Sequence, residues 1–243
     1  MAKTVQDPKE IFPDVIDDYK DVFGDDLISI ILYGSAAGPD YRPGKSDINF
    51  MIVLSEEGIE RLDRAFRLVE TWQKRKVAIP LFLTQLYVES SQDVFPIEYL
   101  NFQRNHVLVY GRDILNELSF DPQFVRLQCE REIKGKLLLL REAFMETAGR
   151  GRALRGVIGP SIQAFAAIFE ALLYLKEEEI PKEKRDVVNL TCDTFDLDAG
   201  LFQKLLDIKE EKLKPDDTET KSLFQNYLKE VRKLSKIVDT LGG

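Results

Sequence analysis

Polar residues at the junction of two apolar runs have the types and the spacing of a phosphate and cation site. The run 29–33 (SIILY) leads directly into Gly34 and Ser35, and the segment 47–50 (DINF) opens the next apolar run after eleven intervening residues. A strand that ends in a glycine turn offers unpaired backbone N–H groups, and the missing side chain lets a phosphate oxygen approach them. Ser35 adds a hydroxyl to this cradle.

Asp47 and Asn49 alternate with two apolar residues, Ile48 and Phe50. On a strand, positions 47 and 49 project from one face while 48 and 50 point to the other face, into a core. Two oxygen ligands beside a phosphate cradle suit Mg²⁺ or Mn²⁺, because Mg²⁺ prefers a few carboxylates together with substrate phosphates. The pattern therefore indicates a metal-bound nucleoside triphosphate. An ordinary hairpin with a polar turn is the alternative.

Two groups of cations are further candidates for phosphate contacts. Arg42 and Lys45 lie in the loop AAGPDYRPGKS between the two halves of the motif, where they either contact a triphosphate or only make the turn soluble. Arg150, Arg152 and Arg155 lie among four glycines in GRGRALRGVIG. Guanidinium groups bind phosphate well, but a structural connection between helices explains this segment equally simply, and we favour that interpretation.

The first half of the chain mixes β-rich runs with helical ones, which predicts an α/β (α+β) domain with a mixed sheet. Helices are expected over 13–24 and 56–75. Strands are expected over 29–33, 47–54, 77–84 and 97–102, the last returning through 106–110. Pro80 confines the third strand to an edge or a bulge because proline cannot donate to a ladder. Trp72 is expected in the core, and His106, the only histidine, on an exposed turn.

Beyond about Pro122 the hydrophobic period is helical alone, which predicts an all-α bundle and a division into domains 1–115 and 116–243. Helices are expected over 122–147, 160–176, 182–193, 198–209 and 218–241. Pro160 is expected in the first turn of its helix. Asp216 and Glu219 have capping-box spacing at the start of the last one. The inward face of the first of these helices is expected to contain Phe124, Leu127, Ile133, Leu137, Leu140 and Phe144.

The composition excludes several classes of protein. The chain has 42 acidic and 34 basic residues and a formal charge of −8, which argues against a generic nucleic-acid binder. No apolar run approaches the ~20 residues that cross a bilayer, so no membrane span is expected. Cys129 and Cys192 are too few and too far apart for a disulfide framework or a zinc site. The N-terminal residues lack the apolar stretch of a secretory signal, and a cytoplasmic location is expected.

The composite of apolar strand, Gly34-Ser35, about a dozen residues and then the segment 47–50 resembles the signature of the nucleotidyltransferase superfamily, the DNA polymerase β-like fold. The resemblance covers roughly residues 13–115, and the later helices resemble the C-terminal bundle of antibiotic and minimal nucleotidyltransferases. It implies a site in the groove between the two domains. There Gly34 and Ser35 would hold the triphosphate and Asp47 would bind Mg²⁺, for transfer of a nucleotidyl group to an acceptor with release of pyrophosphate.

The sequence departs from the family pattern at two places. Asn49 stands where the family has its second metal-binding carboxylate, and an amide oxygen lacks the negative charge that holds the ion. The family's third carboxylate lies on a later strand, but the segment 77–84 contains no acid. Glu98 in FPIEYLNF is then the nearest candidate for a third ligand or general base, with an ordinary solvated strand residue as the alternative.

Three functions are consistent with these residues. The first is an active nucleotidyltransferase with an unknown small-molecule or protein acceptor; the acidic chain suits a cationic acceptor such as an aminoglycoside. The second is a degenerate member that binds nucleotide without turnover, and the third is an antitoxin-like interaction protein. Asn49 favours the last two, whereas Gly34, Ser35 and Asp47 favour retained nucleotide binding.

Overall fold

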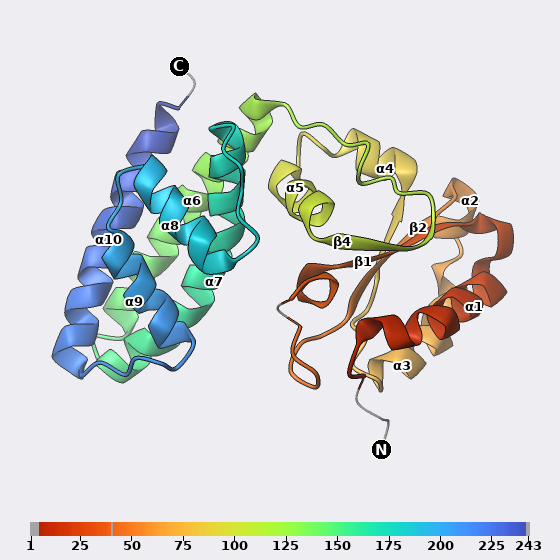
Figure 1. Ribbon diagram of the computed structural model, residues 1–243, viewed down its shortest axis with the longest axis horizontal. Coiled ribbons are helices and arrows are strands. Elements are labelled where there is room, and N and C mark those ends of the chain that lie inside the picture. Colours follow the sequence, from red (N-terminus) through yellow and green to blue (C-terminus); the bar gives the residue numbers. More distant parts are fainter. Residues whose placement is uncertain (1–4, 40, 242–243) are drawn as a thin grey trace. The chain divides into compact units, whose positions relative to one another are not determined.

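The computed structural model describes residues 5–39 and 41–241 and divides into two compact units, Met1–Ser119 and Phe120–Gly243 (Figure 1). The division falls between Ser119 and Phe120, close to the end of the domain 1–115 expected from the sequence. Each unit contains its own set of buried apolar side chains.

A four-stranded mixed sheet forms the centre of the first unit. Its strands are β1 (Leu27–Tyr33), β2 (Asn49–Leu54), β3 (Leu81–Thr84) and β4 (His106–Gly111), in the order β3-β2-β1-β4. β1 pairs antiparallel with β2 and with β4, and β2 pairs parallel with β3. The predicted mixed sheet is confirmed. β3 is shorter than the expected 77–84 because it begins after Pro80, and it lies at an edge, one of the two places that Pro80 allowed.

One face of the sheet is covered by α1 (Phe12–Phe23) and α3 (Phe66–Gln73), which lie on the same side of it in Figure 1. The core between them includes Ile30, Leu32 and Phe50 from the strands and Tyr19 from α1. Trp72 of α3 belongs to this core, as predicted, and its Nε1 donates to Asp18 Oδ2 over 3.0 Å.

The segment expected as one helix over 56–75 is interrupted. It forms α2 (Glu56–Ile59), the 3-10 turn η4 (Leu62–Ala65) and then α3. α2 is capped by Ser55, whose Oγ accepts from Gly58 N over 2.9 Å. A Cβ on Gly58 would lie 2.8 Å from Asp26 Cβ, so the glycine permits close packing here, and glycine is also a weak helix former.

The other face of the sheet is covered by α4 (Gln85–Ser90) and α5 (Pro96–Arg104) (Figure 1). The prediction of a strand over 97–102 is therefore wrong. Pro96 occupies the first turn of α5, and Ile97 and Leu100, three residues apart, are both buried. Their spacing is that of a helix, whereas the aromatic and β-branched composition of FPIEYLNF suggested a strand.

The second unit is a helical bundle, as predicted. Its helices are α6 (Pro122–Glu146), α7 (Gly151–Leu175), α8 (Lys184–Thr194), α9 (Ala199–Lys209) and α10 (Asp217–Asp239). α7 is central and packs against the other four. An aromatic cluster joins α7, α9 and α10 through Phe169, Phe202 and Tyr227, with ring centroids 5.6 Å apart for the first pair and 5.8 Å for the second. Asp216 caps α10 by accepting from Glu219 N over 2.8 Å.

Two details of the bundle differ from expectation. α7 begins at Gly151, so Pro160 lies inside this helix and not in its first turn. Phe124 and Leu127 of α6 are exposed, and the buried face instead passes through Val125. The start of α7 was misplaced because Pro160 resembles a first-turn proline and the glycines before it resemble a loop.

By length and composition α7 is long and apolar enough to cross a membrane, although no span was expected from the sequence. Its buried residues form the centre of the bundle.

The arginine-rich segment before Pro160 is structural in this fold. Gly151 starts α7 so close to α10 that an added Cβ would lie 2.4 Å from Asp217 Oδ1. Arg155 Nη1 donates to Pro215 O over 2.7 Å and to Thr220 Oγ1 over 3.1 Å. The segment thus ties the first turn of α7 to the first turn of α10.

Candidate functional site

The turn after β1 brings Gly34 next to Asn49. Gly34 has φ +73°, a left-handed conformation that other residues rarely adopt, and it begins the 3-10 helix η3 (Gly34–Ala37). Tyr33 at the end of β1 pairs with Asn49 at the start of β2. As a result, a Cβ placed on Gly34 would lie 3.6 Å from Asn49 Nδ2. The turn and the start of β2 are direct neighbours.

The residues around Asp47 alternate between core and outside. Ile48 and Phe50 are fully buried in the core beneath α1, whereas Asp47 is exposed and Asn49 is half-buried. The two polar side chains therefore belong to the side of β2 that faces away from that core. Ser35, next to Gly34 in η3, is half-buried.

Arg42 and Lys45 form a short turn before β2. Lys45 N and Ser46 N both donate to Arg42 O, over 3.0 and 2.9 Å, and Arg42 N donates to Ser46 Oγ over 3.1 Å. These bonds use backbone atoms and the serine hydroxyl, so the two cationic side chains stay exposed. Both interpretations of them, phosphate contact and solubility, remain compatible with this geometry.

Glu98 does not have the position that was expected of a third carboxylate. It lies in the first turn of α5 and is exposed, whereas the predicted role required a place on a strand beside β2. Glu98 thus lies outside the register of the sheet, and its role as a third ligand or general base stays a prediction. The structure brings Gly34, Ser35 and Asn49 together, with Asp47 two residues before Asn49, and leaves Glu98 on a separate element.

A cavity of about 420 Å³ borders the turn and was not predicted. Ala36, Ala37 and Gly38 form one wall, and Lys9 and Tyr41 contribute polar groups. The Tyr41 hydroxyl donates to Val5 O over 3.0 Å, which fixes the N-terminal segment beside the turn. No local sequence pattern predicts this cavity, because its walls come from residues 6–9, 32, 36–39, 41 and 107, which are far apart in the chain.

The donors that are present suit a metal ion that arrives with a nucleotide. Among the described residues, no group of three or more His, Cys, Asp or Glu side chains is placed to hold an ion. Asp47 offers a carboxylate and Asn49 an amide oxygen. Mg²⁺ is commonly bound by one or two carboxylates together with the phosphates of its substrate, so this pair fits a weak site of that kind.

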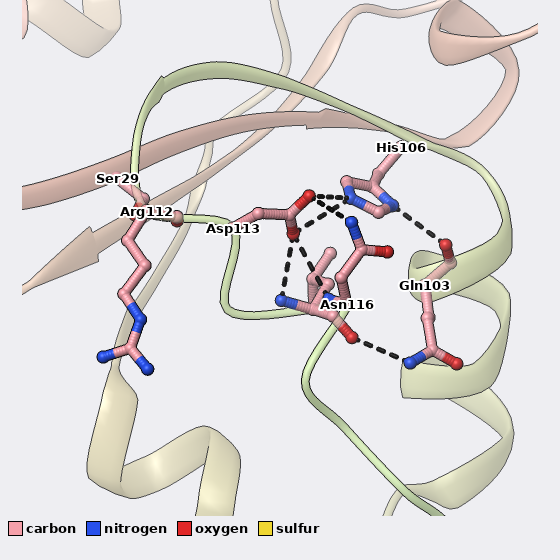
Figure 2. A network of polar contacts seen from close by, with 7 residues as sticks. Ser29, Gln103, His106, Arg112, Asp113 and Asn116 are labelled. Atoms are coloured by element: carbon pink, nitrogen blue, oxygen red, sulfur yellow. Dashed lines mark hydrogen bonds and ion pairs between the residues drawn. The ribbon is translucent and has the colours of Figure 1, made fainter.

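The prediction that His106 lies on an exposed turn is wrong. It is the first residue of β4, pairs with Tyr33 across the sheet, and its side chain is only 8% exposed. Its ring nitrogens bond to Gln103 O and to the carboxylate of Asp113 (Figure 2). Burial also raises the pKa of the neighbouring Tyr33. The polar residues around His106 in the sequence suggested exposure, whereas its ring is buried between Gln103 O and Asp113.

The first unit has a nucleotidyltransferase-like α+β fold with a Gly-Ser turn beside the start of β2, and a helical bundle follows it. A solved structure with this fold is spectinomycin adenyltransferase AAD(9) from Enterococcus faecialis, determined with ATP and spectinomycin. It aligns with a TM-score of 0.50 and 15% sequence identity, over 91% of this chain and 99% of that chain. The likeness confirms the fold that the sequence resemblance implied.

No protein-family model matches the sequence, and no curated protein sequence matches it. The comparison of structures thus carries the assignment of the fold.

Proposed function

We propose that this chain binds a Mg²⁺-bound nucleoside triphosphate at the Gly34–Ser35 turn and that it is a nucleotidyltransferase of low turnover. The observation that carries the proposal is the left-handed turn at Gly34 directly beside Asn49. The side-chain amide of Asn49 is the group beside the turn, and we propose that Asp47, two residues before it, completes a pair of oxygen ligands next to the anion cradle.

Each residue has a task in this proposal. Backbone N–H groups after Gly34 and the hydroxyl of Ser35 bind the triphosphate. Asp47 and the amide oxygen of Asn49 hold Mg²⁺ or Mn²⁺, whose positive charge offsets that of the phosphates. Arg42 and Lys45, exposed on the adjoining loop, add longer-range attraction for the phosphates.

The acceptor is proposed to be a small molecule. AAD(9), which shares the fold, was solved with ATP and spectinomycin, and the formal charge of −8 on this chain suits a cationic acceptor of the aminoglycoside kind. A protein acceptor is the variant of this proposal. We place the activity in the cytoplasm, with which the free, buried state of Cys129 and Cys192 agrees.

A second candidate is a protein that binds nucleotide, or a helical protein partner in the manner of an antitoxin, without turnover. It is favoured by the neutral Asn49, which leaves Asp47 as the one carboxylate of the two proposed ligands. A two-metal reaction normally shares more carboxylates between its ions. In the proposal Glu98 stays the candidate for a third ligand or general base, beside the metal ligands Asp47 and Asn49.

Calorimetric titration with a non-hydrolysable ATP analogue and Mn²⁺ tests the binding proposal. We expect Ser35→Ala and Asp47→Asn each to weaken binding about tenfold, the size of one bond to a charged group. Ser222→Ala, an exposed serine on α10, is the matched control and should bind as the unchanged protein does. A crystal grown with the analogue should show its phosphates at Gly34 and Ser35.

Absence of analogue binding by the unchanged protein would overturn the proposal. If the analogue does bind, pyrophosphate release measured with Mg-ATP and a panel of aminoglycosides separates the active transferase from the protein without turnover. Release above the level of Asp47→Asn supports a transferase, and binding without release supports the second candidate.

A further inference from the structure

The side of α6 that points away from the core of the second unit contains apolar side chains where a bundle helix normally has polar ones. Leu127, Leu138 and Met145 are 54%, 63% and 77% exposed. They follow one another at steps of eleven and seven residues, close to three and two helical turns, so they lie on one side of the helix. Cys129 and Leu140, on the opposite side, are buried. A row of exposed apolar residues on one helix marks a contact surface.

Four residues occupy the middle of this side of α6, and we call them the α6 face: Arg131, Gly135, Leu138 and Glu142. They are spaced four, three and four residues apart, so at 3.6 residues per turn they lie within about 60° of one another. All four are exposed. A Cβ on Gly135 would meet nothing within 4 Å, so the middle of the α6 face is open to a partner.

The two charges of the α6 face are available for contacts outside the chain. Within the described part of the chain, no basic side chain pairs with Glu142. Arg131 makes only a long contact of 3.7 Å to its neighbour Glu132, which also pairs with Lys136 over 3.0 Å. Lys134, by contrast, is held by two carboxylates over 2.5 and 2.7 Å. A partner therefore meets one positive and one negative charge here, eleven residues apart.

We propose that the α6 face pairs with the same face of a second copy of this chain, with the two α6 helices antiparallel about a two-fold axis between positions 136 and 137. Arg131 and Glu142 lie equally far from this axis, on opposite sides of it. The axis therefore brings Arg131 of each copy to the level of Glu142 of the other, which forms two ion pairs. A parallel pairing in register would instead put like charges together, which is unfavourable.

The same axis also matches the shape of the α6 face. Leu138 and Gly135 lie equally far from it, so Leu138 of each copy comes to the level of Gly135 of the other. Because glycine has no side chain, the two helices can approach closely there, and Leu127 and Met145 flank the contact. One charged pair and one steric pair thus define one axis. This self-complementarity is what a two-fold interface between identical chains requires, and an unrelated partner does not require it.

The contact is expected to be weak. About this axis the two helices overlap over residues 127–146, a length of about 30 Å. A single helix pair of that length buries less than the ~1,600 Å² of a standard interface, so we expect a dissociation constant on the order of 10 µM. The pairing uses the second unit alone, whereas the proposed nucleotide site lies in the first, so either proposal can fail without the other.

Analytical ultracentrifugation of the full chain from about 1 to 200 µM tests the pairing. We expect the unchanged protein to pass from monomer to dimer over this range. Leu138→Gln and Gly135→Gln should each weaken the dimer about tenfold or more, the first by removing an apolar contact and the second by filling the open space. Glutamine is a good helix former, so far-ultraviolet circular dichroism should show both variants folded.

An exchange of charges tests the register of the two helices. Arg131→Glu and Glu142→Arg should each associate at least about tenfold more weakly, because each alone places like charges together twice. An equal mixture of the two variants should recover association, because both ion pairs then form between one chain of each kind. Arg232→Glu, which reverses an exposed charge on α10, is the matched control and should associate as the unchanged protein does.

Two outcomes would overturn the proposal. The first is an unchanged protein that stays monomeric throughout the concentration range, which would mean that a different partner covers the α6 face or that nothing does. The second is a mixture of the charge variants that associates no more strongly than each variant alone, because association through another face or another register is not restored by this exchange. Recovery in the mixture, together with loss in Leu138→Gln, supports the antiparallel pair.

Discussion

The charge of the proposed ion site depends on Asn49, which can be changed with little effect on shape. Asn49→Asp is nearly isosteric and adds a negative charge two residues from Asp47, so we expect it to tighten Mn²⁺ binding about tenfold or more. Without metal, two close carboxylates resist joint ionisation, and the variant should be slightly less stable. Calorimetric Mn²⁺ titrations with and without ATP analogue measure the first effect, and urea unfolding measures the second.

Asn226→Asp is the matched control for that substitution. It adds the same charge on the exposed side of α10 in the second unit, so its Mn²⁺ affinity should stay at the level of the unchanged protein. Equal affinity in Asn49→Asp and in the control would show that position 49 is not a ligand. Robust nucleotidyl transfer by the unchanged protein would show that the missing carboxylate matters less than we propose.

At the scale of residues, the local sequence pattern predicted the burial of side chains where burial depends only on neighbours along the chain. The alternation of buried Ile48 and Phe50 with Asp47 and Asn49 follows from strand geometry alone. The burial of His106 could not be predicted in this way. Its partner Asp113 lies seven residues on, beyond β4, and the bond forms only because the chain turns back after that strand.

Among the elements, the end of β4 depends on a glycine. Gly111 has φ +80°, and a Cβ there would lie 1.9 Å from Ile28 O. Gly111→Ala should therefore lower the free energy of unfolding of the first unit by at least about 2 kcal/mol, from the left-handed backbone and the displaced strand together. Urea unfolding followed by tryptophan fluorescence measures the loss.

Gly135 in α6 provides the opposite case. A Cβ there would meet nothing within 4 Å, and its position inside a long helix favours alanine. Gly135→Ala should raise the stability of the second unit by about 0.5–1 kcal/mol. If the two alanine variants had similar effects, the steric account of Gly111 would fail.

The contact between α8 and α9 should depend on pH through Glu210. Hydrogen bonds from Lys212 and from Arg185, over 2.7 and 2.8 Å, lower the pKa of Glu210 from 4.5 to about 2. A depressed pKa in the folded state means that this stabilisation is present above the unfolded pKa and disappears as the pH falls toward the folded one.

Glu210→Gln should consequently lower the stability of the second unit at neutral pH by about 0.5–1 kcal/mol, the range of partly exposed ion pairs. The difference from the unchanged protein should vanish as the pH falls from 4.5 to about 2. Urea midpoints from far-ultraviolet circular dichroism at several pH values measure it. Glu211→Gln, on a more exposed neighbour, should show no such pH dependence, and a difference that persisted in acid would refute the role of the ionised Glu210.

Helices and strands were predictable where the hydrophobic period agreed with the proline, glycine and capping residues at their ends. α1 and α10 begin and end near their proline, glycine and capping signals. α5 was missed because its aromatic and β-branched residues favour a strand, although Ile97 and Leu100 have helical spacing. Tertiary packing against Tyr33, whose ring lies 4.7 Å from that of Phe102, decides in favour of the helix.

For the whole molecule, the hydrophobic period changes near Pro122, and the structure divides into two compact units after Ser119. The central place of α7 was not predictable, because it follows from contacts with α8, α9 and α10, which come later in the chain. All residues of the proposed nucleotide site precede the division. The two units should therefore respond differently to a nucleotide.

The single tryptophan makes that difference measurable. Trp72 is buried in the first unit, so its fluorescence reports the unfolding of that unit, whereas far-ultraviolet circular dichroism is dominated by the long helices of the second. Mg-ATP at a hundred times its dissociation constant should stabilise the fluorescence transition by about 2.7 kcal/mol and leave the helical transition nearly unchanged. Ser35→Ala should reduce the shift. A shift of the helical transition alone would place the nucleotide site in the second unit, and no shift of either would show that the Gly34 turn does not bind nucleotide.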